Sequence, residues 1–139
     1  MATVATDLIT YLATVSGVGS ITAALPTLYA GTMPEFPDEC GAVIEYGGLP
    51  GTYVLGQDAI HHEFPRVQVV FRGEKQDYTG PRDKAESAYQ ALAALANTTI
   101  NGTKYLRLEP LQPPFRIVQD GNLRFHIGFN LSIEKEPEA

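Results

Sequence analysis

Histidine is the residue type in this chain best suited to metal or acid–base chemistry, and it occurs at positions 61, 62 and 126. His61 and His62 are adjacent, so in a strand their side chains point to opposite faces. No cysteine or acidic residue accompanies them at the spacing of a zinc site, which needs three or four protein ligands. We therefore expect no metal and no cofactor. A small metal- or ligand-binding enzyme domain around His61, His62 and His126 is the alternative.

The residues that could act as nucleophiles lack the surroundings that would activate them. Cys40, the single cysteine, precedes an expected strand and has no helix N-terminus behind it to lower the pKa of its thiol. No serine lies in a G-x-S-x-G elbow. Gly17-Val18-Gly19 follows an expected helix, whereas a dinucleotide-binding loop follows a strand. The sequence therefore predicts that the protein is not an enzyme.

Charge and composition exclude two further classes of protein. The net charge of −6 argues against a sequence-independent nucleic-acid binder, which needs a basic stripe. No apolar run approaches the roughly 20 residues that cross a bilayer, so we expect no membrane partner. The charge is unevenly placed, because residues 1–65 contain seven acidic residues and no Lys or Arg. Such an asymmetry either orients partners or only solubilises the surface.

Periodicity predicts the elements that must position these residues. Apolar residues recur at helical spacing over 6–15 and over 81–96. Alternation and β-forming residues predict strands at 27–32, 41–46, 66–72, 98–100, 104–109, 115–118 and 123–134, with a hairpin at Asn101-Gly102. We expect one domain over residues 1–139. Its expected class is α+β, with a mostly antiparallel sheet and helices packed on one face.

Two segments interrupt this pattern. Residues 47–64 lack any period and contain several glycines and prolines, so we expect a long loop, which is usually functional or disordered. Tyr53, Leu55 and Phe64 in this loop either fold back onto the core or contact a partner. Residues 134–139 are charged and contain a proline, which predicts a flexible tail.

The last strand, 123–134, alternates without a break between apolar odd positions and polar or glycine even positions. It would span roughly 40 Å, whereas the 81–96 helix spans roughly 24 Å, so one helix cannot cover its apolar face. This mismatch favours assembly. We expect a core containing Val67, Val69, Phe71, Tyr89, Leu92, Phe125, Ile127, Phe129 and Leu131. Expected interface residues, from the loop and the polar face of this strand, are Tyr53, Leu55, Ile60, His61, His62, Phe64, Arg124, His126 and Asn130.

Three stretches in order carry a resemblance to a known family. The first is 33–38 followed by 40–48, and the second is 64–73 leading into the alanine-rich helix. The third is 100–106, then Asp120-Gly121-Asn122 and the long strand. Together they resemble the tail terminator and minor capsid proteins of long-tailed bacteriophages, also called head–tail joining or tail completion proteins.

The resemblance implies a structural virion protein, made in the host bacterial cytoplasm, that forms a homo-hexameric ring. Such a ring sits at the head-proximal end of the tail tube, ends tube polymerisation and joins the tail to the head connector. The implied partners are other copies of the chain, the major tail tube protein and the head-side connector or stopper protein. DNA would pass through the lumen without sequence-specific binding. Another neck component, such as a head-completion protein, is the alternative within this class.

Overall fold

The computed structural model describes residues 3–22, 25–53 and 60–137. Within them, the chain forms two helices and seven strands. In sequence order they are α1 (Val4–Leu12), β1 (Leu28–Ala30), β2 (Cys40–Tyr53), β3 (Ile60–Lys75), α2 (Thr79–Ala93), β4 (Ala96–Ile100), β5 (Thr103–Pro110), β6 (Phe115–Gln119) and β7 (Arg124–Lys135). No helix in the described residues is long and apolar enough to cross a membrane.

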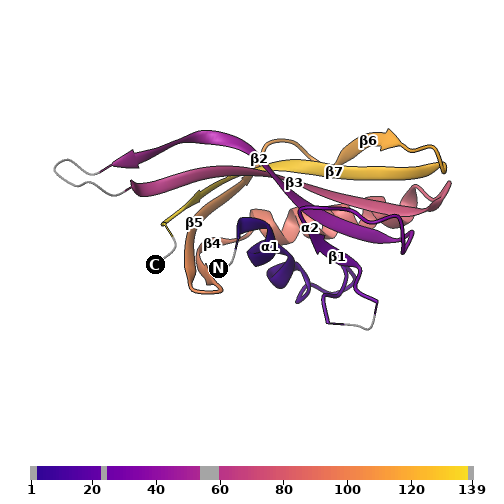
Figure 1. Ribbon diagram of the computed structural model, residues 1–139, viewed down its shortest axis with the longest axis horizontal. Helices are drawn as coiled ribbons and strands as arrows, with labels where there is room; N and C mark the ends of the chain where they lie inside the picture. Colours follow the sequence, from indigo (N-terminus) through magenta and orange to yellow (C-terminus); the bar gives the residue numbers. More distant parts are fainter. Residues whose placement is uncertain (1–2, 23–24, 54–59, 138–139) are drawn as a thin grey trace.

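The strands form one curled sheet in the order β1-β2-β3-β7-β5-β4, and β6 also pairs with β7 (Figure 1). The long strand β7 lies at its centre. β3 pairs along one edge of β7, while β6 pairs with its first half and β5 with its second half. The pairing of β1 with β2 is parallel and the other pairings are antiparallel. The hairpin at Asn101-Gly102 is confirmed, since both residues form the turn between β4 and β5.

The expected α+β class, with helices packed on one face of a mostly antiparallel sheet, is wrong. The protein is mostly β, with 48% strand and 20% helix, and its sheet is mixed and curled. Of the two helices in the described residues, α1 contacts β1, β2 and β4 and α2 contacts β3, β5 and β7. The expectation failed because the strands continue through segments whose glycines and prolines had predicted a loop.

Those segments lie within the expected 47–64 loop. Residues 47–53 are the end of β2 and residues 60–64 the start of β3, and residues 54–59 lie outside the described part of the chain. Shifts in the β2–β3 register after Tyr46 and after Leu49 accommodate the irregular sequence. At Gly48 a Cβ atom would come within 2.2 Å of the Phe64 carbonyl oxygen, so this close pairing requires glycine.

Residues 134 and 135, expected in a flexible tail, instead form the end of β7, which continues to Lys135. The last two residues of β7 contact the start of β3 through their side chains. His62 Nδ1 lies 2.9 Å from Glu134 Oε2, and Lys135 Nζ lies 3.6 Å from Glu63 Oε1. The long strand therefore braces the base of the β2–β3 ribbon.

The core lies between the sheet and the two helices. Of the nine residues expected there, Val67, Val69, Phe71, Leu92, Ile127, Phe129 and Leu131 are buried. The other two, Tyr89 and Phe125, are partly buried and pack against the core. Tyr89 meets the Phe129 ring edge to face, with ring centroids 5.6 Å apart. The apolar side of β7 is thus largely covered within the single chain.

Candidate functional site

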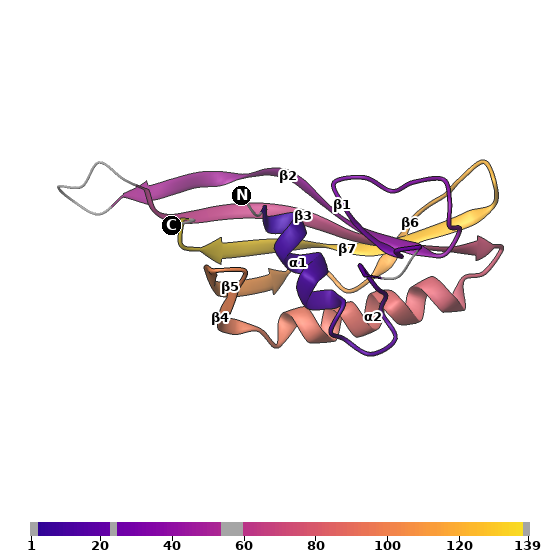
Figure 2. The same ribbon diagram turned by 60° about the horizontal axis from the view of Figure 1, so that its bottom comes forward.

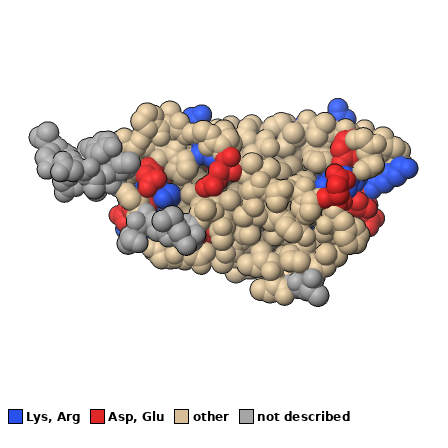
Figure 3. Space-filling view, viewed as in Figure 1, with Lys and Arg blue, Asp and Glu red and all other residues tan. Residues whose placement is uncertain are grey.

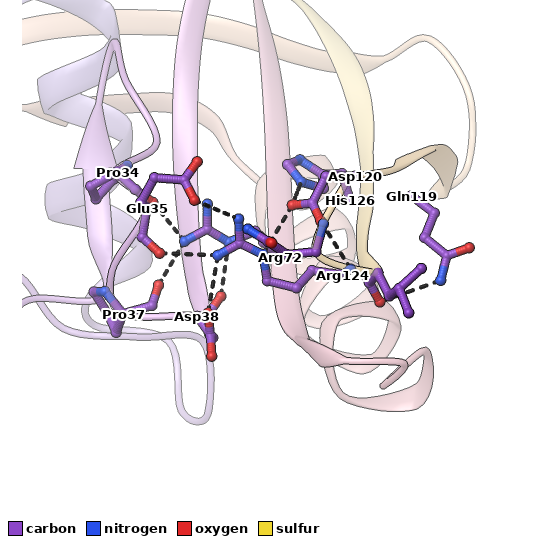
Figure 4. Close-up of polar contacts among 11 residues, drawn as sticks. Pro34, Glu35, Pro37, Asp38, Arg72, Gln119, Asp120, Arg124 and His126 are labelled. Carbon is purple, nitrogen blue, oxygen red and sulfur yellow. Dashed lines mark hydrogen bonds and ion pairs between the residues drawn. The ribbon is translucent and has the colours of Figure 1, made fainter.

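Two arginines on adjacent strands hold the segment that connects β1 to β2. Arg72 on β3 and Arg124 on β7 are both buried, and both lie on the sheet side opposite the core residues (Figure 4). Arg72 donates through Nη2 to the carbonyl oxygens of Pro34 (2.6 Å) and Pro37 (2.7 Å). Its Nε donates to the carbonyl oxygen of Asp38 at 3.0 Å. One side chain thereby fixes three backbone carbonyls.

Arg124 binds the same segment mainly by pairing with carboxylates. It makes 3.0 Å ion pairs with the carboxylates of Glu35, Asp38 and Asp120, and it also donates to the Glu35 carbonyl oxygen. Burial alone would lower the pKa of Arg124, but hydrogen bonds to Glu35 and Asp38 and the charge of Asp120 raise it. We call residues 33–39 the clamped loop, because both arginines anchor its backbone, and we call Arg72, Arg124, Asp120 and His126 together the clamp.

Asp120 completes this network from the turn that precedes β7. Its carboxylate accepts hydrogen bonds from the backbone N–H groups of Asn122 and Arg124, and its Oδ2 lies 3.0 Å from His126 Nε2. Burial opposes ionisation of Asp120, but the hydrogen bonds from His126 and these two amides, with the charge of Arg124, outweigh it. They hold the pKa of the Asp120 carboxyl well below its usual range.

Because of this pKa shift, the free energy of unfolding depends on pH in the acid range. A carboxyl whose pKa is lower in the folded chain than in the unfolded chain contributes stability above its unfolded pKa, about 4. That contribution is lost as the pH falls through the folded pKa. We expect the free energy of unfolding, measured by urea denaturation between about pH 2 and pH 7, to fall below about pH 4. Asp120→Asn should lose less stability over that interval than the wild type, and equal losses would contradict the assignment.

The second feature is a two-stranded ribbon formed by the far ends of β2 and β3. It extends past both helices and past the end of β7 (Figures 1 and 2). We call residues 46–53 and 60–65 the arm. Leu49 is 59% exposed and Tyr46 43% exposed, although both are large and apolar in character. A groove on the arm is lined by Tyr46, Gly48, Leu49, Pro50, Gly51, Glu63, Phe64 and Pro65.

The structure divides the expected interface residues between these two features. Phe64 lies in the arm groove, and His62 on the arm is paired with Glu134. Tyr53, Ile60 and His61 belong to the arm strands, but their side chains lie outside the described part, as does Leu55 altogether. His126 belongs to the clamp, and Asn130 accepts a hydrogen bond from Gln68 at 3.3 Å. Arg124, expected on a water-facing interface, is instead buried within the chain.

Neither feature resembles a catalytic centre. In the described residues, no group of three or more His, Cys, Asp or Glu side chains is placed to hold a metal ion. Burial raises the pKa of the Cys40 thiol against the opposing charges of Arg72 and Arg124, and this disfavours the reactive thiolate. The arrangement suits a different task, which is to present a rigid loop and a projecting ribbon to other molecules.

Sequence reasoning missed Arg72, Glu35 and Asp120 as parts of a site. The contacts of Arg72 and Arg124 with the clamped loop join residues that lie 34 to 89 positions apart in the chain. One signal was present in the sequence, namely the excess of acidic residues before Arg66 and the placement of every basic residue from Arg66 onward. The clamp uses this asymmetry inside one chain, where Glu35 and Asp38 of the first half pair with Arg124 of the second.

Comparison with known proteins identifies the family. A family model described as bacteriophage tail terminator protein matches residues 11–137. This match covers both the clamped loop and the arm, as well as every strand of the sheet. A comparison with curated proteins found no match.

Proposed function

The chain belongs to the bacteriophage tail terminator family, and on this premise we propose that it forms a homo-hexameric ring at the head-proximal end of the tail tube. Proteins of this family are structural components of the phage tail. In the proposed role, the ring stops polymerisation of the tube and joins the finished tail to the head connector. The protein acts by binding and positioning, without catalysis.

The observation that carries the proposal is the arm. The arm projects beyond the core and leaves the side chains of Leu49 and Tyr46 in contact with water. Exposed apolar groups of this size favour association with another molecule. Side-chain contacts of Glu134 with His62 and of Lys135 with Glu63 hold the base of the arm against the sheet. A braced projection supplies a contact surface whose ordering costs little on binding.

The proposed partners are other copies of the chain, the major tail tube protein and the head-side connector or stopper protein. DNA passes through the lumen of the ring without sequence-specific contacts. The net charge of −6 supports this part of the proposal, because a basic lumen would bind phosphates and retard the passage of DNA. Charged side chains on the face shown in Figure 3 gather toward its two ends, and most of its middle carries none.

Native mass spectrometry over a range of protein concentrations tests the ring directly. We expect a species of six chains that grows at the expense of the monomer as the concentration rises, and negative-stain images that show a ring of the same particles. A particle that stays monomeric at every concentration, both alone and with tube protein added, would contradict the proposal.

A further inference from the structure

We propose that Phe36 of one subunit docks into the arm groove of the next copy of this chain, and this inference rests on the proposed ring. The contact would be heterologous, since the two surfaces that meet are different parts of the same molecule. Repetition of one heterologous contact closes a ring when the rotation between neighbouring copies adds up to a full turn.

Phe36 is exposed on a loop that the fold holds rigid. Its side chain is 71% exposed, the highest value among the large apolar residues that the structure describes as exposed. The carbonyls on both sides of it are fixed, those of Pro34 and Pro37 by Arg72 and that of Glu35 by Arg124. An aromatic side chain on a preorganised loop loses little entropy on binding, which is the usual character of an interface anchor.

The arm groove offers a mixed surface with an apolar part that suits a phenyl ring. Leu49, Phe64 and Pro65 contribute side chains to its lining, and the neighbouring Gly48 and Gly51 leave it shallow and open. Leu49 and Phe64 face each other across the two strands in the register of the ribbon. An aromatic ring from a second molecule would cover apolar surface that the subunit itself leaves in contact with water.

The clamped loop is acidic, and an arginine without an ion pair in the described part of the chain lies beside the groove, whose own carboxylate, Glu63, is paired with Lys135. The clamped loop contains Glu35, Asp38 and Glu39 and no basic residue. Glu35 and Asp38 pair with Arg124 of the same chain, whereas the exposed Glu39 forms no ion pair among the described residues. Arg66 follows the groove residue Pro65 and pairs in register with Tyr46, another groove residue. Its Nε is buried and has no hydrogen-bond partner among the described residues, in which Arg66 also forms no ion pair. The Glu39 carboxylate, which arrives with Phe36, would supply an ion-pair partner for this guanidinium.

A subunit cannot make this contact with itself. The clamped loop ends at the start of β2, where Cys40 pairs with Arg72, whereas the groove residue Leu49 lies nine positions further along the same strand. At about 3.3 Å per residue, this places the two surfaces roughly 30 Å apart. The loop and the arm accordingly lie toward opposite ends of the sheet (Figure 2). A second copy, placed head to tail, brings them together.

Disulfide trapping between single-cysteine variants tests the contact. Phe36→Cys and Leu49→Cys are each made in a Cys40→Ala background, which removes the one native thiol. After oxidation at a concentration where the wild type forms the ring, we expect covalent dimers only when the two variants are mixed. A chain that carries both cysteines should give a ladder of multiples. Leu111→Cys, at a side chain that is 46% exposed, replaces Phe36→Cys in the matched control and should give no dimer with Leu49→Cys.

The possible results distinguish a failure of this inference from a failure of the proposed function. Dimers of Phe36→Cys alone would show a contact between identical surfaces and would overturn the inference, as would a mixture that forms the ring without covalent dimers. In both cases the ring itself would stand. Phe36→Ser should raise the dissociation constant of the ring by about tenfold or more, and an unchanged constant would also overturn the docking. A wild-type chain that forms no ring would instead overturn the proposed function.

Discussion

Phe129→Asp is expected to leave the chain unfolded. Phe129 lies on β7 at the centre of the sheet, its side chain is 0% exposed, and its ring packs against Tyr89. Removal of a buried phenyl ring alone costs about 3–5 kcal/mol, and an unpaired carboxylate in its place adds a large desolvation cost. Since a domain is stable by only about 5–15 kcal/mol, the sum is enough to abolish folding.

Circular dichroism and urea denaturation measure this result, and Phe115→Asp is the matched control. Phe115 lies on β6, which pairs with the same strand, but its side chain is 39% exposed. We expect Phe115→Asp to fold and to unfold cooperatively in urea. A cooperative unfolding transition for Phe129→Asp near that of the wild type would show that the core is misassigned.

Arg72→Ala is expected to release the clamped loop and to lower the free energy of unfolding by about 3 kcal/mol. A hydrogen bond to a charged group contributes about 1.5–3 kcal/mol, and Arg72 donates three of them to Pro34, Pro37 and Asp38. The effect should be smaller than their sum, because the freed carbonyls belong to a surface loop that water can reach. Arg124 would still hold the loop through Glu35.

Hydrogen exchange and urea denaturation together distinguish this local release from general destabilisation. We expect the amides of residues 33–39 to exchange faster in Arg72→Ala by a larger factor than those of the central strands. Arg107→Ala is the control, since Arg107 pairs with Glu109 at an exposed site, where an ion pair contributes about 0–1 kcal/mol. Uniformly faster exchange throughout the Arg72→Ala protein, with no excess in the loop, would contradict the clamp.

The central strands were predictable from the sequence, because one buried face imposes a strict alternation. Shifting a strand by one residue would turn all its apolar side chains toward water, so Val67, Val69, Ile127 and Phe129 identify β3 and β7 and their inward faces. The Asn101-Gly102 hairpin was predictable for a local reason, since its turn needs residues that tolerate positive φ. Asn101 and Gly102 have φ values of 50° and 83°.

The arm and the fold class were not predictable in this way. A two-stranded ribbon that projects from the core has no buried face to enforce alternation, so its strands tolerate Gly48, Pro50 and Gly51. In the sequence alone, these residues predict a loop. Because those residues were assigned to a loop, the strand content was underestimated. The parallel pairing of the short strand β1 with β2 depends on contacts that only the folded chain establishes.

The clamp was the least predictable part of the candidate site. Arg124 occupies an even position of β7, and the alternation placed it correctly on the face away from the core. It is nevertheless buried, because the clamped loop folds back over that end of the sheet. Alternation reports which face a side chain is on, and it carries no information about a distant loop that covers the face.

Electron microscopy of tail tubes assembled with and without this chain tests the central claim most directly. The tube protein is allowed to polymerise alone, with the wild-type chain, or with Phe129→Asp as an unfolded control. We predict that the wild-type chain halts elongation and appears as a ring at one end of each tube, and that Phe129→Asp does neither. Tubes that elongate equally in all three mixtures, with no ring at their ends, would contradict the assignment as a terminator.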